Sequence, residues 1–487
     1  MELTVLVFLP AGAAVVVLLL PARYEGMAKY VALAGALAAL ALSIEMFFAF
    51  DIHGKGFQFV ERREWVDIGA FNLQYFVGVD GLSMPLVVLT TFLTTASVLV
   101  SFSVTTRPRL YYALLLVLST SVLGVFTALD FMLFFLFWEL ELFPMFLLIA
   151  VWGSGRKEYS ATKFVLYTIA GSAFMLVGIL VLAFSANTFD VEVLGRADFK
   201  DTILPLRWVF LFLFIGFAVK LPIFPLHTWL PDAHSDAPTA VSVMLAGVLL
   251  KMGGYGIIRI CVTILPGVAD DYSVWFAIIG SVSILYGAFV TLRQTDVKRL
   301  IAYSSVSHMG LVLLGISALG NTSMVGATYQ MLAHGVITGL LFVMVGLMYE
   351  RTHTREIARL GGLARQMPLI TTGMVFAGFA SLGLPALGGF VAEVSVFVGT
   401  FHRYEWAVLL SIFGVVLSAG YVLWMLERVV FGPVRHEWDE VTDQRHWWEH
   451  SAVAGLAALV ILLGVYPSLM TDMINPAIDT VVQRVGS

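Results

Sequence analysis

The chain has 487 residues, of which 59% are hydrophobic and only 13% are charged, and its formal net charge is −5. About a quarter of the residues in a soluble domain are charged, so this composition excludes a soluble globular protein and indicates an all-α polytopic membrane protein. The single cysteine, Cys261, excludes a disulfide framework, a cysteine-based zinc cluster and a cysteine-ligated iron–sulfur centre.

Apolar segments long enough to cross about 30 Å of hydrocarbon recur along the whole chain. The first lacks a basic N-terminal flank and is followed by further spans, so we interpret it as a retained helix rather than a signal peptide. Segments 207–230 and 369–402 contain internal prolines and glycines, and we expect both to be broken. The pattern predicts fourteen spans, near residues 2–20, 28–50, 82–103, 109–128, 131–151, 161–186, 207–230, 238–262, 273–292, 296–319, 324–349, 369–402, 405–427 and 451–470.

Basic residues orient the predicted bundle. Loops on one side carry about twice as many Lys and Arg residues as loops on the other, which places that side in the cytoplasm. Because the number of spans is even, both termini are expected on the non-cytoplasmic side.

A short motif predicts two related halves. Gly-x-x-Phe-x-x-Val-Gly at 171–178 reappears at 339–346, and one span later each half has a Leu-Pro, at 221–222 and 384–385. Five spans separate the copies, and an odd number inverts the topology. We therefore expect two inverted five-helix repeats, each with a discontinuous helix. The expected divisions are N-terminal helices at 1–103, a first repeat at 104–263, a second repeat at 264–431, and a C-terminal loop and helix at 432–487.

The fifth span contains two carboxylates, Glu139 and Glu141. A charge at mid-bilayer costs roughly 2.5–3.5 kcal/mol, so each must be neutral, paired or hydrated. Residues two positions apart lie about 200° apart around a helix, so the two cannot face one partner equally. Glu139 is interpreted as part of a charge relay, the alternative being a structural pair with Lys163 or another cation. Glu141 is expected to be dispensable, at an interface or edge.

Lys220 lies directly before the break of the seventh span, in KLPIFPLHTWLPDAH. The three prolines of this stretch cannot donate to a helix ladder, and broken backbone at membrane depth is tolerated only against protein or water. An ammonium group here can pair with a carboxylate in one state and release its proton when that partner moves away. Lys220 is thus a candidate relay group, the alternative being a structural lysine. The later polar residues are expected to cap the second half-helix: His227, Asp232 and His234.

Four more ionisable residues interrupt later spans: Lys251, His308, His334 and Glu393. Lys251 has no local counter-ion, which favours a lysine that passes protons between the other ionisable residues of the spans. Histidine can both accept and donate a proton near neutrality, although a lone intramembrane histidine can equally be a hydrogen-bonded core residue. Glu393 follows the second break and is a candidate exit station.

At these residues the chain resembles the antiporter-like membrane subunits of complex I, and most of all their M chains, whose mitochondrial counterpart is subunit 4. The matching segments lie in order between residues 131 and 393, and the number of spans agrees with the family. They are FWELELFPM, the ATKF at 161–164, KLPIFPLHTWLPDAHSDAPTAVSVMLAGVLLKMGGYG, RLIAYSSVSHMG, QMLAHG, MYERTHTREIARLGGL and GFVAE.

The family pattern implies a hydrophilic axis in the plane of the membrane. By matching motif, Glu139 is the carboxylate that pairs with Lys220, the lysine of the broken helix. Lys251 is the central lysine of the next helix, and Glu393 is the terminal glutamate, where two sister subunits carry lysine. The pattern assigns relay or supporting positions to three more residues: His308, His334 and Lys163. The implied transfer runs from Lys220 by His308 to Lys251, then by His334 to Glu393.

The resemblance implies a proton-translocating membrane-arm subunit of a type I NADH dehydrogenase, coupled to electron transfer to quinone in partner subunits. Flavin, iron–sulfur clusters and quinone are expected in those partners, which include sister antiporter-like subunits. No cofactor, metal or nucleic acid is expected on this chain. The expected location is the bacterial plasma membrane, with the thylakoid membrane as the alternative because photosynthetic-type complexes share the ELEL sequence. The electron donor stays open between NADH, ferredoxin and another carrier.

Other functions remain open at this point. One is a subunit of an Mrp-type multisubunit Na⁺/H⁺ antiporter, which shares the lysines and broken helices but usually lacks HTWLPDAH and YERTHTREI. Another is a membrane subunit of an energy-converting hydrogenase. A third, a purely structural spacer, does not account for six charged residues inside membrane spans.

Overall fold

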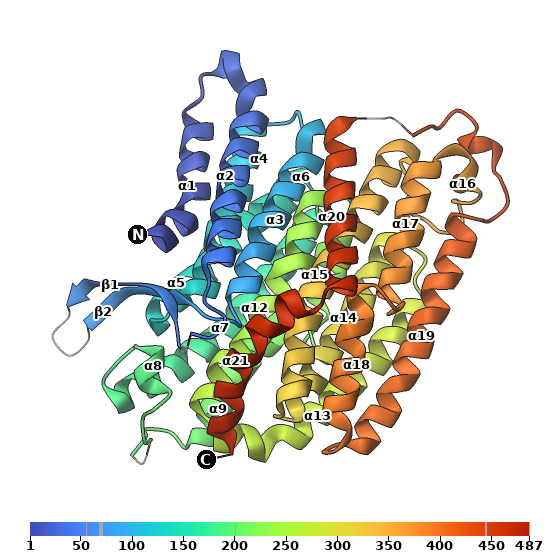
Figure 1. The fold of residues 1–487 in the computed structure, drawn as a ribbon. Coiled ribbons are helices and arrows are strands. Elements are labelled where there is room, and N and C mark those ends of the chain that lie inside the picture. Colours follow the sequence, from blue (N-terminus) through green and yellow to red (C-terminus); the bar gives the residue numbers. More distant parts are fainter. Residues whose placement is uncertain (55, 68–71, 200, 444–445, 487) are drawn as a thin grey trace.

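The computed structural model describes residues 1–54, 56–67, 72–199, 201–443 and 446–486. These residues form a bundle of upright helices with a single two-stranded hairpin at one end (Figure 1). Twelve helices of the described chain are long and apolar enough to cross a membrane. Two further spans are broken into shorter helices, so the fourteen predicted spans are confirmed.

Two of the unbroken spans are divided into consecutive helical segments by local irregularities. In chain order the unbroken spans are α1 Glu2–Leu19, α2 Ala28–Ala49, α3 Met84–Val100, α4 Pro108–Thr127, α5 Phe131–Leu140 with α6 Leu142–Trp152, α7 Lys157–Ala186, α11 Thr239–Met244 with α12 Leu250–Gly256, α13 Pro266–Leu292, α14 Val297–Ser317, α15 Asn321–Thr352, α19 Glu405–Val429 and α20 Trp447–Val465. The shorter elements are α8 Val191–Leu194, α16 Leu363–Gln366, η1 Ala22–Met27, η2 Ser101–Ser103 and η5 His436–Trp438.

Both predicted breaks are present. Helix α9 (Leu206–Lys220) ends at Lys220, and α10 (Trp229–Asp236) begins only after the first two prolines that follow it. Helix α17 (Pro368–Ser381) and α18 (Gly388–Phe401) flank the second break, where Gly383 has a φ of 72°. The boundaries of the two five-helix repeats remain a prediction.

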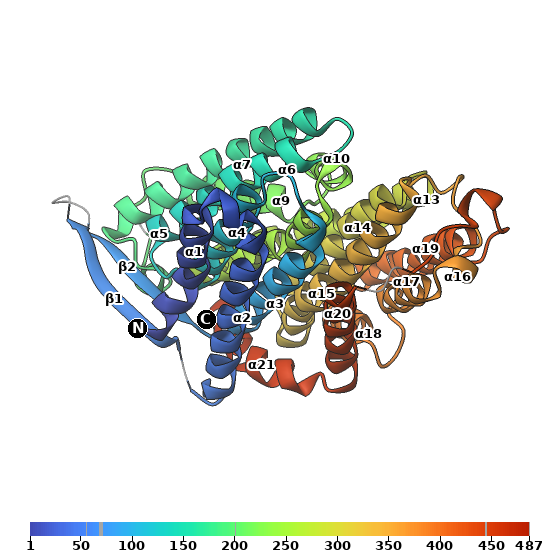
Figure 2. The ribbon, with the colours of Figure 1, turned by 90° about the horizontal axis from the view of Figure 1, so that it is seen from above.

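Helix α15 is the central element of the bundle. Viewed from above, it lies between the helices of the first half and α17, α18 and α20 (Figure 2). Its apolar window is wholly buried in the protein, whereas α1, α2 and α20 present much of their apolar surface to the outside. A polar residue on the apolar part of α15 therefore faces other helices and not lipid.

Both chain ends lie toward the face that carries the hairpin β1 (Gln58–Asp67) and β2 (Asn72–Val79). The N-terminal ammonium lies 3.2 Å from Glu61 on β1, and near the C-terminus Arg484 donates to the carbonyl of Gly195 at 3.1 Å. Helix α21 (Ser468–Val485) crosses this face of the bundle (Figure 1). The hairpin and α21 were not predicted from the sequence.

The span that carries Lys251 is irregular on both sides of that residue. A π-helical segment, η3 (Leu245–Leu249), precedes α12, and a second, η4 (Ile257–Val262), follows it. Such wide turns are rare and cluster at functional sites. Gly253 lets this span pack closely against α9, since a Cβ there would lie 2.5 Å from the backbone nitrogen of Leu221 and 2.6 Å from the carbonyl oxygen of Phe217.

This close approach predicts that Gly253→Ala destabilises the protein. The added methyl meets backbone atoms, which cannot move aside as a flexible side chain can, and overpacking of this kind costs about 1–3 kcal/mol. The midpoint of thermal unfolding should fall, and so should the amount of the subunit in membranes. Gly267→Ala is the matched control, because a Cβ there meets nothing within 4 Å; equal behaviour of the two variants would contradict the prediction.

Candidate functional site

Lys220 forms a buried ion pair with Glu141. The ammonium donates to Oε1 of Glu141, and the two side chains are 1% and 0% exposed. The rings of Trp138 and Phe164 lie 5.5 and 5.3 Å from the ammonium nitrogen, so the charge also faces two aromatic surfaces. Its position in the last turn of α9 adds a favourable interaction with the carbonyl end of that helix.

The expected partner of Lys220 was Glu139, and the structure places Glu141 there instead. Glu141 lies at the junction between α5 and α6, where its side chain points inward. Glu139 is half-buried and lies on the same side of the helix as the exposed Leu136, Leu140 and Phe143. Among the described residues, its buried Oε1 has no hydrogen-bond partner. The expectation that Glu141 is the dispensable carboxylate is therefore not supported by the pairing.

Lys163 belongs to a second charged cluster. Its ammonium lies 2.7 Å from Oδ2 of Asp232, and Arg299 lies 3.2 Å from the other oxygen of the same carboxylate. Asp232 is part of α10, so this cluster joins the second half of the broken span to α7 and α14. Asp232 was expected to cap the half-helix; its side chain instead holds two cations.

Lys251 is fully buried and contacts a histidine. Its ammonium lies 2.8 Å from Nδ1 of His334 and also donates to the carbonyl of Ala246. When Lys251 is protonated, its ammonium can only donate, so Nδ1 of His334 then accepts and the neutral ring carries its proton on Nε2. That Nε2 is buried and has no hydrogen-bond partner in the described part of the chain.

His308 lies beside His334, with the two ring centroids 5.5 Å apart. Its Nδ1 is 3.3 Å from the amide nitrogen of Gln330, and its Nε2 is 3.3 Å from the hydroxyl of Ser381. Gln330 and Ser381 were not predicted as partners from the sequence. A usable signal existed for Gln330, since it stands four residues before His334 and thus on the same side of a buried helix.

Glu393 completes this group from α18. It lines a small cavity of about 10 Å³ together with both histidines, Gln330 and Ser381. A cavity of roughly 10–15 Å³ is the least that holds one water molecule. Gly383, at the second break, lies against the carboxyl group, and a side chain there would occupy the space of Glu393.

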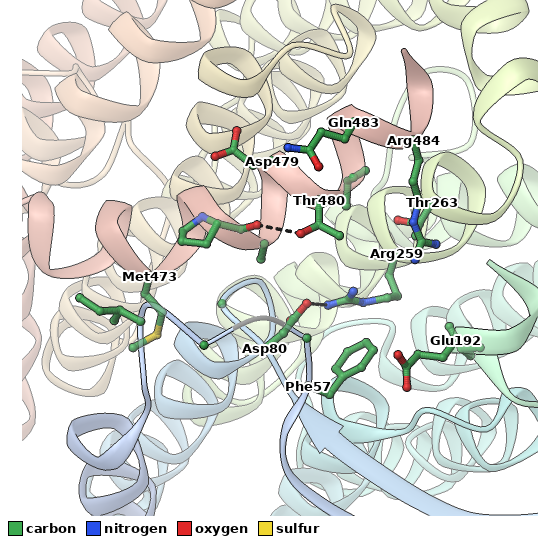
Figure 3. Close-up of a pocket in the computed structure, with 18 of the residues that line it drawn as sticks. Phe57, Asp80, Glu192, Arg259, Thr263, Met473, Asp479, Thr480, Gln483 and Arg484 are labelled. Atoms are coloured by element: carbon green, nitrogen blue, oxygen red, sulfur yellow. Dashed lines mark hydrogen bonds and ion pairs between the residues drawn. The ribbon is translucent and has the colours of Figure 1, made fainter. Parts of the chain in front are cut away.

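A larger pocket, of about 700 Å³, lies under α21 at the hairpin face (Figure 3). Asp80 and Arg259 form an ion pair of 2.5 Å in its wall. Both arginine and carboxylate side chains line it, so the lining favours neither anions nor cations. The described residues contain no group of three His, Cys, Asp or Glu side chains able to hold a metal ion.

The ion pair predicts unequal effects of removing the two carboxylates. Glu141→Ala leaves the Lys220 ammonium buried without a counter-ion, a change that costs about 3–5 kcal/mol in comparable pairs. Glu139→Ala should cost much less, because no described group pairs with it. Thermal unfolding of the purified protein and its level in membranes measure both; a larger loss in Glu139→Ala would show that the pairing is wrong.

Residues 128–418 match the family model described as NADH:quinone oxidoreductase/Mrp antiporter, transmembrane. The chain is 44% identical to the NADH-quinone oxidoreductase subunit M of Rhodobacter capsulatus, over 99% of its own length and 96% of that protein. It is 42% identical to the NAD(P)H-quinone oxidoreductase chain 4 of Gloeobacter violaceus, over 98% and 92% of the two lengths. A chain in the structure of respiratory complex I from Thermus thermophilus with bound NADH superposes with a TM-score of 0.91 at 28% identity, covering 100% of both chains.

Proposed function

The chain belongs to the family of membrane subunits described as NADH:quinone oxidoreductase/Mrp antiporter, and on that premise we propose how it moves protons. Its similarity to quinone oxidoreductase subunits extends over nearly its whole length. The chain is a membrane-arm subunit of a complex I-type NADH dehydrogenase, and the oxidoreductase activity is that of the complex. The membrane spans carry the ionisable groups through which protons are translocated.

The buried Glu141–Lys220 pair is the observation that carries this mechanism. Two unit charges 4 Å apart attract each other with about 4 kcal/mol at an effective dielectric constant near 20. Weakening that attraction changes the proton affinity of a lysine by roughly a thousandfold. A change of charge or position near the pair can therefore switch Lys220 between holding a proton and giving it up.

Glu139 is placed to transmit a change of charge from a neighbouring subunit to the Glu141–Lys220 pair. It lies on the outward side of α5, two residues from Glu141, so a negative charge on it would repel the carboxylate of Glu141. We assign it the role of the relay carboxylate that responds to a neighbouring membrane subunit, while Glu141 holds the lysine. Lys163 has a supporting role, because its pair with Asp232 holds the second half of the broken helix.

The second part of the route runs from Lys251 to Glu393. Lys251 passes a proton to Nδ1 of His334, at 2.8 Å, and the ring releases its Nε2 proton toward the small cavity. His308 borders the same cavity, so the contacts favour placing it after Lys251 and not before it. Glu393 receives the proton there and releases it at the exit. Transfer from Lys220 to Lys251 takes place through water.

The chain is an integral membrane protein of a multisubunit membrane complex. We propose that its direct partners include sister antiporter-like subunits, and that flavin, iron–sulfur clusters and quinone are bound by other subunits. The bacterial plasma membrane is the proposed location, with both termini on its non-cytoplasmic side. The names of the relatives support either NADH or NADPH as the donor of this type of complex, and ferredoxin remains an alternative.

Lys220→Ala should abolish proton pumping by the complex reconstituted in vesicles. The substitution removes the ammonium paired with Glu141, so the switch cannot form. Pumping is measured as the pH gradient formed during quinone reduction. Lys29→Ala, at the cytoplasmic edge beside Tyr30, is the control and should pump normally. Proton flux at the wild-type rate in Lys220→Ala would refute the relay.

The composition of the purified complex tests the assignment itself. We expect this chain to co-purify with peripheral flavin and iron–sulfur subunits. Isolation with small antiporter subunits alone would instead establish an Mrp-type antiporter, and isolation with a nickel subunit would establish an energy-converting hydrogenase.

A further inference from the structure

Gln330 connects the two proton stations that border the small cavity. It lies on α15, is 2% exposed, and places its amide nitrogen 3.3 Å from Nδ1 of His308. Its amide oxygen is buried and has no hydrogen-bond partner among the described residues. The same side chain lines the cavity of about 10 Å³ that Glu393 also lines. The amide nitrogen therefore contacts His308, whereas the amide oxygen lacks the hydrogen-bond partner that a buried acceptor requires.

The amide nitrogen of Gln330 faces His308, and this orientation fits one protonation state of the ring. An amide nitrogen can only donate, so Nδ1 of His308 must accept and cannot hold a proton of its own. The ring is then neutral, with its proton on Nε2, and donates to the hydroxyl of Ser381. A protonated Glu393 would supply the hydrogen-bond donor that the amide oxygen of Gln330 lacks.

We propose that the side-chain amide of Gln330 couples the protonation of His308 to that of Glu393 by turning between two orientations. In the first, the amide nitrogen donates to neutral His308 and the amide oxygen accepts from protonated Glu393. In the second, the oxygen accepts from Nδ1–H of protonated His308 and the nitrogen donates to ionised Glu393. Gln330 is a positioning residue in this scheme, since the proton never resides on it.

The two orientations balance as steps of one cycle. Starting from the first, Glu393 releases its proton to the exit and His308 takes up one proton from the Lys251–His334 side, which gives the second. Protonated His308 then gives one proton across the cavity to ionised Glu393, which restores the first. Each cycle moves one proton from His334 to the exit, and the amide turns twice. This inference rests on the proposed relay. It adds a residue, Gln330, that couples the protonation of His308 to that of Glu393.

Turning the amide requires little rearrangement. In the structure the amide oxygen has no hydrogen-bond partner among the described residues, and a turn of the amide exchanges only its hydrogen bonds to His308 and Glu393. His308 is held at both nitrogens, by Gln330 and by Ser381, which makes an amide turn a smaller movement than a rotation of the ring.

Gln330→Met tests the proposal, because methionine has a similar length and neither a donor nor a strong acceptor for these groups. Proton pumping by the reconstituted complex should fall about tenfold or more, approaching the scale of a lost acid–base group. In infrared difference spectra, the carboxyl C=O band of protonated Glu393, assigned by its loss in Glu393→Gln, should move to higher frequency because its O–H loses an acceptor. Gln366→Met is the control: its amide oxygen is also buried without a described partner, but it lies at the end of α16, outside the axis.

Gln330→Leu keeps the test decisive if the methionine variant assembles poorly. Leucine is an uncharged side chain of moderately smaller volume, so a residue needed only for packing would largely tolerate it. It can neither donate to neutral His308 nor accept from protonated Glu393, and we expect the same loss of pumping. Wild-type pumping in either variant, or lost pumping in Gln330→Met with an unmoved Glu393 band, would overturn the coupling. Lys220→Ala is measured in the same experiment. Normal pumping in Lys220→Ala would refute the proposed relay as a whole. Loss of pumping in Lys220→Ala with normal pumping in the Gln330 variants would leave the relay in place and refute only the role of Gln330.

Discussion

A charge placed in hydrocarbon must find its partner inside the protein, and the arrangement of this molecule follows from that requirement. Each lysine of the axis is met by a group from another helix: Lys220 by Glu141, Lys163 by Asp232, and Lys251 by His334. These contacts join segments that are far apart in the sequence. The helices cannot slide or rotate independently without separating a pair, so the same contacts that make charge tolerable in the membrane also fix the positions of the broken spans.

The architecture could be predicted from the sequence because the relevant signals are local. Length and apolarity identify a membrane span, and the prolines after Lys220 and Leu384 identify the breaks, whatever packs around them. The hairpin and α21 escaped prediction because they are not membrane spans, and length and hydropathy carry no such signal for them. Their strand alternation and amphipathic character are weak compared with the apolar run of a membrane span.

The choice between Glu139 and Glu141 could not be made from the sequence. In a soluble helix the polar side faces water and the apolar side faces the core, but both sides of this span are apolar. Geometry says only that the two carboxylates point in different directions. Which one points inward depends on how α5 and α6 pack against the other helices, and in the structure it is Glu141 that faces Lys220. Gln330 was not predicted for a related reason. An uncharged amide in an apolar span gives no signal in the sequence, and only its contacts in the folded protein indicate a role.

The two π-helical segments on either side of Lys251 give its span a property that straight helices lack. A π turn contains one residue more than an α turn, so moving it along the helix rotates the intervening residues by about 100° without breaking the helix. The segment between η3 and η4 is seven residues long and carries Lys251 near its start. A shift of either π turn by one position would therefore change the direction in which Lys251 points, while the two ends of its span keep their places in the bundle.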